Sequence, residues 1–169
     1  MSDRLIDALH ADGPDGDQTR LFGRFAGSWH LAWTGTTPAG EPAAARGELH
    51  VGYVLDGRAV QDVWIVPGRG EPGAGEPPLA FHGTTVRFYD RDLAAWRSTW
   101  IEPVNGLVRR FIGRATDDGI ELISDEDAPM LRWSFSQITP ESFVWTGESS
   151  TDGGRSWQRD EQMRATRMA

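Results

Sequence analysis

The stretch Ala95–Gly119, AWRSTWIEPVNGLVRRFIGRATDDG, decides the fold class. Its apolar and polar residues largely alternate, and a period of two residues is typical of a half-buried β-strand. The pair Asn105-Gly106 interrupts the alternation, and Asp118-Gly119 ends the next run. Both pairs favour the tight turn of a β-hairpin. The stretch therefore predicts two consecutive antiparallel strands with a third to follow.

The same pattern continues along most of the chain and predicts about ten strands, separated by turn residues and not by helices. The expected strands are Trp29–Gly35, Gly47–Leu55, Arg58–Val66, Leu79–Tyr89, Ala95–Glu102, Leu107–Ala115, Gly119–Ser124, Leu131–Ile138, Ser142–Ser150 and Ser156–Arg167. Sequential hairpins favour an antiparallel up-and-down sheet, and closure of so many strands removes the exposed edges. We therefore expect an all-β, closed antiparallel barrel.

The N-terminal part differs from the rest of the chain. Its first apolar residues have helical spacing, and a Gly/Pro/Asp cluster at 12–17 ends this helix. We expect residues 1–28 to form a short helical segment that caps the barrel, and residues 29–169 to form a single barrel domain. The segment 67–78 is rich in Gly, Pro and Glu and predicts a long loop.

Composition excludes several kinds of site. The 169 residues include no Cys, and all 17 basic residues are Arg. Disulfides, thiolate metal sites, Schiff-base lysines and phosphate-loop lysines are therefore ruled out. A net charge of −8 disfavours binding to nucleic acid or to an anionic membrane. No stretch approaches the ~18 apolar residues of a membrane-spanning helix, and the N-terminus lacks a signal-peptide pattern, so we expect a cytoplasmic protein.

The run Ser150-x-Asp152-x-Gly154-x-Ser156-Trp157 has the spacing of the Asp-box of sialidases. Asp152 can accept backbone N–H groups across a turn, and glycine tolerates the positive φ angles of a hairpin tip. The motif occurs once, and a glycosidase needs two positioned carboxylates. It therefore predicts the tip of the last hairpin and not a glycosidase site.

Gly-Ser-Trp at 27–29 resembles the Gly-x-Trp that opens the first strand of calycins, a group that includes lipocalins and fatty-acid-binding proteins. In that group an Arg of the last strand packs over the Trp. The resemblance implies this role for Arg164 first, with Arg167 and Arg159 as the next matches.

Three longer stretches are LDGRAVQDVWIVP (55–67), HGTTVRFYDRDLAAWRSTWIEPVNG (82–106) and FVWTGESSTDGGRSW (143–157). They look like an uncharacterised bacterial family of lipocalin-like barrel proteins, and the resemblance covers Phe22–Arg167. It implies a closed barrel with a central cavity and brings no established reaction.

Nitrobindin-like haem barrels are more distant calycin-type relatives, and they use a histidine near the C-terminus as the axial ligand of the haem. The histidines here are His10, His30, His50 and His82. None lies on the last strands, so we expect neither haem nor another cofactor, and no metal.

The faces of the strands follow from their alternation. Arg97 should be solvated, which turns Trp96 and Trp100 inward. The same logic on the preceding strand predicts that His82 points inward and Arg87 outward. A ten-stranded barrel is wider than side chains can fill, so aromatic residues around the remaining space predict an apolar pocket with a few polar groups. The expected ligand-binding residues are Trp64, His82, Trp96, Trp100, Arg110, Trp133 and Trp145.

The candidate acids and bases of this pocket are Asp62, His82 and Glu102. Arg109 and Arg110 point to opposite faces, so one of them should face inward and pair with Glu102 or Asp62.

These features predict a protein that binds a small apolar or aromatic molecule in the barrel. The alternatives are a cofactor-independent isomerase or cyclase that uses the same cavity, and an interaction protein whose barrel is filled. Val63 and Ile65 lie on the strand face opposite Asp62 and Trp64. An apolar outer patch of this kind predicts a homodimer.

Overall fold

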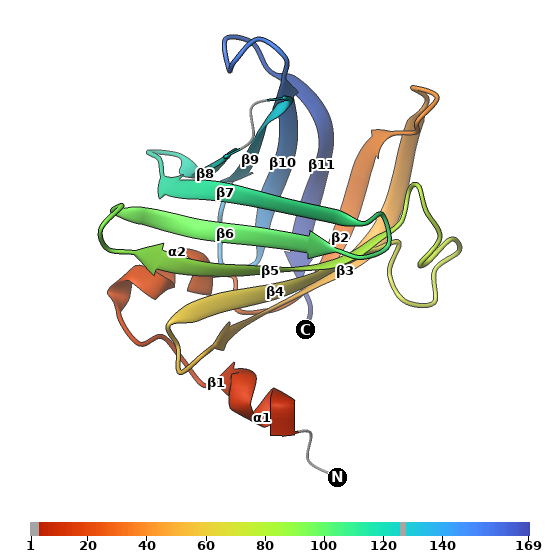
Figure 1. Cartoon of the computed structure of the whole chain (residues 1–169). Helices are drawn as coiled ribbons and strands as arrows, with labels where there is room; N and C mark the ends of the chain where they lie inside the picture. Colours follow the sequence, from red (N-terminus) through yellow and green to blue (C-terminus); the bar gives the residue numbers. More distant parts are fainter. Residues whose placement is uncertain (1–3, 126–127) are drawn as a thin grey trace.

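The computed structural model describes residues 4–125 and 128–169 and contains a closed antiparallel barrel (Figure 1). Its strands are β2 (Gly27–Thr36), β3 (Pro42–Val54), β4 (Ala59–Val66), β5 (Phe81–Asp90), β6 (Ala95–Glu102), β7 (Leu107–Ala115), β8 (Gly119–Ser124), β9 (Met130–Ser136), β10 (Ser142–Ser150) and β11 (Gln158–Arg167). Each strand pairs with the next, β11 pairs with β2, and the short strand β1 (His10–Ala11) adds to β3. The predicted ten-stranded fold is confirmed.

The helices of the described residues all precede β2, as predicted: α1 (Arg4–Leu9), the 3₁₀ helix η1 (Asp17–Thr19) and α2 (Arg20–Gly23). Phe22 of α2 and Phe25 pack into the barrel core, where Phe22 meets Trp96 edge-on at 4.9 Å between ring centroids and Phe25 contacts Phe143 at 4.6 Å. Phe22 and Phe25 thus occupy one end of the barrel, which is called the closed end below. None of these described helices has the length and apolar character needed to cross a membrane.

The opposite end of the barrel carries the longest connection. In an up-and-down barrel alternate turns lie at the same end, so the β2–β3, β4–β5, β6–β7 and β10–β11 connections lie away from α2. Figure 1 shows the β4–β5 loop (yellow-green) beside the β6–β7 turn. Asn105 of that turn donates from Nδ2 to the carbonyl oxygen of Ala80 at 2.8 Å. This end, called the open end below, is where a cavity can reach solvent.

The prediction of which β5 side chains point into the barrel is wrong. Arg87 is 2 % exposed and lies inside the barrel, whereas His82 and Phe88 are exposed outside. Arg87 tolerates this position because the carboxylate of Asp62 on β4 neutralises it. An arginine is expected to be solvated unless it pairs with a buried acid, and Arg87 has such a partner on the neighbouring strand.

The expected role of Arg164 is also wrong. The guanidinium carbon of Arg167 lies over the ring of Trp29, 4.1 Å from its centroid. Arg167 shares the inner parity of Met163 and Ala165 on β11, which are buried. Arg164 has the opposite parity and is exposed, so alternation along β11 selects Arg167.

Candidate functional site: a cavity at the open end of the barrel

A cavity of about 480 Å³ lies inside the open end of the barrel. Indole rings form much of its wall, and those that line it are Trp33, Trp64, Trp100, Trp133 and Trp145. Four of the five are in contact in series: Trp64 lies 6.0 Å from Trp145, Trp145 lies 5.4 Å from Trp133, and Trp133 lies 6.2 Å from Trp100, between ring centroids. Such offset and edge-on pairs are the favoured arrangements of aromatic rings. Four of the lining indoles therefore form one connected row beside the cavity.

Glycines make room for three of these rings. A Cβ atom at Gly35 would lie 2.5 Å from the ring of Trp33, one at Gly83 would lie 2.5 Å from the ring of Trp100, and one at Gly147 would lie 2.8 Å from the ring of Trp145. These distances are too short for a side chain, so each indole lies over a glycine of its own or the adjacent strand. The sequence thus fixes where these rings stand.

The predicted ligand-binding residues divide into two groups. Trp64, Trp100, Trp133 and Trp145 line the cavity, and their role in binding stays a prediction. Trp96 is buried as expected, but it packs against Phe22 near the closed end instead of lining the cavity.

The polar members of the prediction need correction. His82 is exposed on the outer face, because β5 presents Gly83 and Thr85 inward. Arg110 also faces outward, and its Nε lies 3.1 Å from Oδ2 of Asp125. The neighbouring Arg109 lines the cavity instead, because it pairs across the sheet with the inward Trp100.

Asp62 and Arg87 form a buried ion pair beside the inner part of the cavity. Their side chains are each 3 % exposed, and Nη1 of Arg87 donates to Oδ2 of Asp62. The other carboxylate oxygen, Oδ1, accepts the backbone N–H of Thr85 at 2.9 Å. Both oxygens of Asp62 are therefore engaged, which leaves the carboxylate poorly placed to take a proton from a ligand.

Glu102 is buried at the rim of the cavity and is held by the β6–β7 turn. Its oxygens accept the backbone N–H groups of Val104 at 2.7 Å, Asn105 at 2.9 Å and His82 at 3.3 Å, and the side-chain amide of Asn105 at 2.9 Å. Burial raises the pKa of Glu102, but these hydrogen bonds outweigh it and hold the pKa below its usual value. The expected pairing of Glu102 with an arginine is not seen, and its contacts are those of a turn-forming residue.

Glu161 on β11 is a cavity residue that the sequence reasoning missed. Trp33 donates from Nε1 to Oε2 of Glu161 at 2.6 Å. Burial raises the pKa of Glu161, the indole hydrogen bond opposes this shift, and the nearby charge of Asp160 adds to it. The alternation of side chains along the strand could have identified it, because Glu161 lies two residues from Met163 and shares the inner face of β11 with it. Glu161 is therefore the cavity acid whose pKa is displaced toward neutrality.

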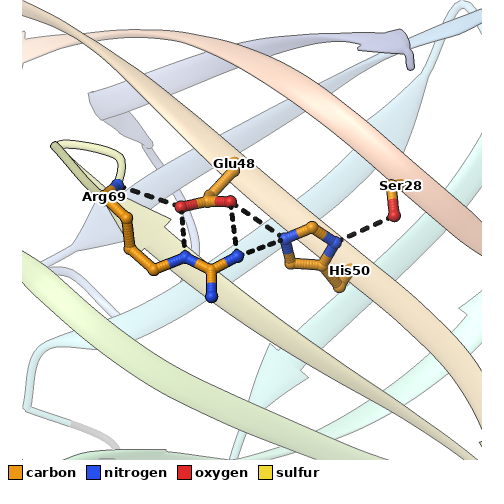
Figure 2. Close-up of polar contacts among 4 residues, drawn as sticks. All are labelled: Ser28, Glu48, His50 and Arg69. Atoms are coloured by element: carbon orange, nitrogen blue, oxygen red, sulfur yellow. Dashed lines mark hydrogen bonds and ion pairs between the residues drawn. The ribbon is translucent and has the colours of Figure 1, made fainter. Parts of the chain in front are cut away.

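A second polar cluster, drawn in Figure 2, lies on the outer face of the barrel. Ser28 Oγ is 2.9 Å from Nδ1 of His50, and Nε2 of His50 is 3.0 Å from Oε2 of Glu48. Glu48 also accepts the backbone N–H, Nε and Nη2 of Arg69 at 2.9, 2.8 and 2.9 Å. The bonds from Arg69 hold the pKa of Glu48 far below its usual range. Although the order serine–histidine–carboxylate is that of a proton relay, its contacts fasten the start of the β4–β5 loop to β3.

The Asp-box residues form the tip of the β10–β11 hairpin. Asp152 accepts the backbone N–H and the hydroxyl of Ser156 at 2.9 and 2.7 Å, and the hydroxyl of Ser150 at 2.8 Å. Hydrogen bonds from Ser156 and Ser150 lower the pKa of Asp152 to about 2. The guanidinium carbon of Arg132 lies 4.3 Å from the ring centroid of Trp157. These contacts are those of a structural turn.

Comparison with known proteins shows the fold of the chain and not its family. No protein-family model matches the sequence, and no curated protein is significantly similar to it. The structure is similar to that of Rv2717c from M. tuberculosis, with a TM-score of 0.66 and 14% identity over 91% of this chain and 99% of the other. It is also similar to the S-type phycobiliprotein lyase CPES from Guillardia theta, with a TM-score of 0.57 and 14% identity over 92% of this chain and 94% of the other. The chain thus shares the overall barrel fold of these two proteins.

Proposed function

We propose that the protein binds a small apolar or aromatic molecule in the cavity of its barrel. The observation that carries this proposal is the wall of five indole rings around about 480 Å³. The volume lies within the roughly 300–1,000 Å³ of small-molecule sites, and such sites are mostly apolar with a few placed polar groups. One structural neighbour is named as a phycobiliprotein lyase, and this likeness supports the use of such a barrel for a small molecule.

A second candidate is an isomerase or cyclase that uses the same cavity, and Glu161 is the observation that favours it. A carboxyl group whose pKa is raised by burial can donate a proton at a pH where an ordinary carboxyl cannot. Asp62 and Glu102 are less suited because hydrogen bonds already engage their oxygens. An interaction protein whose barrel is filled is the least favoured candidate, since the barrel contains a cavity of about 480 Å³.

A ligand screen tests the binding proposal. Flat aromatic and acyl compounds are added to the protein, and tryptophan fluorescence and the melting temperature are measured. A ligand that binds only the folded state raises the melting temperature by mass action. Trp100→Phe should weaken binding of most hits, whereas Trp157→Phe, in the outer hairpin, should not. If no compound changes fluorescence or melting, the proposal is wrong.

The enzyme alternative has its own readout. Each hit is incubated with the protein and recovered for mass spectrometry and chromatography. Rearranged product that forms with the wild type and not with Glu161→Gln would favour catalysis. Unchanged ligand from both proteins would favour binding alone.

A further inference from the structure

Three neighbouring residues of β5 and β6 each carry a buried polar atom without a hydrogen-bond partner. Among residues 4–125 and 128–169, the buried side-chain atoms without a hydrogen-bond partner are Thr85 Oγ1, Arg87 Nε and Ser98 Oγ. Thr85 and Arg87 line the cavity, and Ser98 is paired with Arg87 across the β5–β6 ladder. Their residues are 0 %, 2 % and 1 % exposed. Because buried polar groups are nearly always hydrogen-bonded, a cluster of three unpaired ones points to a missing partner.

The chemistry of the cluster specifies an acceptor as that partner. Arg87 Nε can only donate, and each hydroxyl can donate as well. The acid beside them, Asp62, already accepts from Thr85 N and from Arg87 Nη1. The unused capacity of the cluster is therefore mainly hydrogen-bond donation.

The charge balance of the cluster decides the kind of acceptor. Asp62 and Arg87 neutralise each other, so a carboxylate ligand would leave one uncompensated negative charge at a buried position. The other cation of the cavity wall, Arg109, is partly solvent-exposed and donates to the carbonyl oxygen of Val108 at 3.2 Å. A neutral oxygen fits the cluster without this cost.

We propose that the inner end of the cavity binds a neutral carbonyl oxygen, such as that of a ketone, ester or quinone. Thr85 and Arg87 donate to this oxygen, supported by Ser98, while the flat apolar body of the ligand lies against the indole rings. The inference rests on the proposed function, because it requires that an aromatic molecule enters the cavity.

Three probes that share one fused-ring body test the inference: fluorene, 9-fluorenone and fluorene-9-carboxylate. Dissociation constants are measured by calorimetry. Fluorenone should bind about three- to tenfold more tightly than fluorene, the range that one neutral hydrogen bond contributes. The carboxylate should bind most weakly of the three. Thr85→Val and Ser98→Ala should each reduce the ratio of the fluorene dissociation constant to the fluorenone dissociation constant.

The matched control is Thr99→Val, which makes a similar change on the outer face of β6 and should leave all three constants unchanged. Infrared spectroscopy of fluorenone labelled with ¹³C at the carbonyl gives a direct readout. Its stretching band should lie at lower wavenumber in the wild-type complex than in hydrocarbon solvent, and should return toward the solvent position in Thr85→Val. Thr85→Val should also fold at least as stably as the wild type, since it removes an unpaired hydroxyl.

The outcomes separate the inference from the proposed function. Equal binding of fluorene and fluorenone, or a carbonyl band at its hydrocarbon-solvent position, would overturn the carbonyl site and leave aromatic binding intact. Tightest binding of the carboxylate would replace it with an anion site. If none of the probes binds, and the wider screen also fails, both proposals are wrong.

Discussion

The guanidinium of Arg167 covers the ring of Trp29 and joins three segments at the closed end of the barrel. Its Nη1 donates to the carbonyl oxygen of Ala26 at 2.9 Å, and its Nε donates to that of Pro140 at 2.7 Å. Because Trp29 lies on β2 and Arg167 on β11, this contact seals the seam between the first and last strands of the barrel. Residues that are far apart in sequence thereby hold the barrel closed.

Loss of either partner should therefore destabilise the protein. Trp29→Ala should lower the free energy of unfolding by about 3–5 kcal/mol, as expected for a large core truncation. Arg167→Met should cost about 1–2 kcal/mol through the lost cation–π contact and hydrogen bonds. Arg164→Met, on the exposed face of the same strand, should change stability by less than about 0.5 kcal/mol. Denaturant titration measures all three, and equal losses for the two arginines would contradict the assignment.

Glu161 should make stability fall as the pH rises. Below the unfolded-state pKa of about 4.3 the carboxyl is protonated in both states, so no charge is buried on folding. Since its folded-state pKa is raised, the folded state carries a disfavoured charge once the pH passes that value. Glu161→Gln should thus be more stable than the wild type at pH 8 and equal to it at pH 4, in thermal melts. Glu141→Gln, at an exposed site, serves as the charge control, and a pH-independent gain for Glu161→Gln would contradict the prediction.

Glu48 should control the opening of the β4–β5 loop. Its folded-state pKa is lowered, so its contribution is present above the unfolded-state pKa of about 4.3 and is lost as the pH falls through the folded-state value. At pH 7, Glu48→Gln should increase amide hydrogen exchange in the loop residues 67–80 without changing the exchange of the barrel strands. Glu76→Gln, exposed within the same loop, is the control. Unchanged exchange in Glu48→Gln would show that Arg69 does not fasten the loop.

The homodimer stays a prediction, and the structure indicates which outer surface to test. Ile65 is only 5 % exposed, but Ile101 and Val108 are 45 % and 54 % exposed and lie in one row with Val63 across the sheet. Analytical ultracentrifugation at micromolar concentration should show a dimer of the wild type and a monomer of Ile101→Arg. Leu93→Arg, at another exposed apolar position, should remain dimeric. A monomeric wild type would remove the dimer from consideration.

The strands were predictable because their signals are local. The turn pairs Asp56-Gly57, Asn105-Gly106 and Asp118-Gly119 separate alternating runs, and most observed strand ends lie within two residues of those expected. The start of β3 is an exception, because this strand begins at Pro42 and not at the expected Gly47. The side chains of β6 that point out of the barrel were predictable, because the charged Arg97 identifies the outer face of this strand. The same prediction failed on β5 because both of its faces carry apolar and polar residues, and only the pairing of Arg87 with Asp62 decides between them.

The site was predictable in composition more than in geometry. Aromatic parity placed Trp64 and Trp100 on inner faces, but which part of the interior stays open depends on the packing of α2 into the closed end. Trp96 packs against Phe22 of α2 and therefore does not line the cavity. The unpaired atoms of Thr85 and Ser98 depend on contacts across strands, which no alternation of residues along one strand encodes.

The bonds between Glu48 and Arg69 also have a kinetic consequence. The loop that they fasten carries Pro78, Leu79 and Ala80 to the rim of the cavity. Exposed charge-assisted bonds weaken as added ions screen them. We therefore expect the rates at which an uncharged ligand enters and leaves the cavity to depend on ionic strength, while its affinity for the indole rings hardly changes. Added salt should thus change the association and dissociation rates of the ligand more than its dissociation constant.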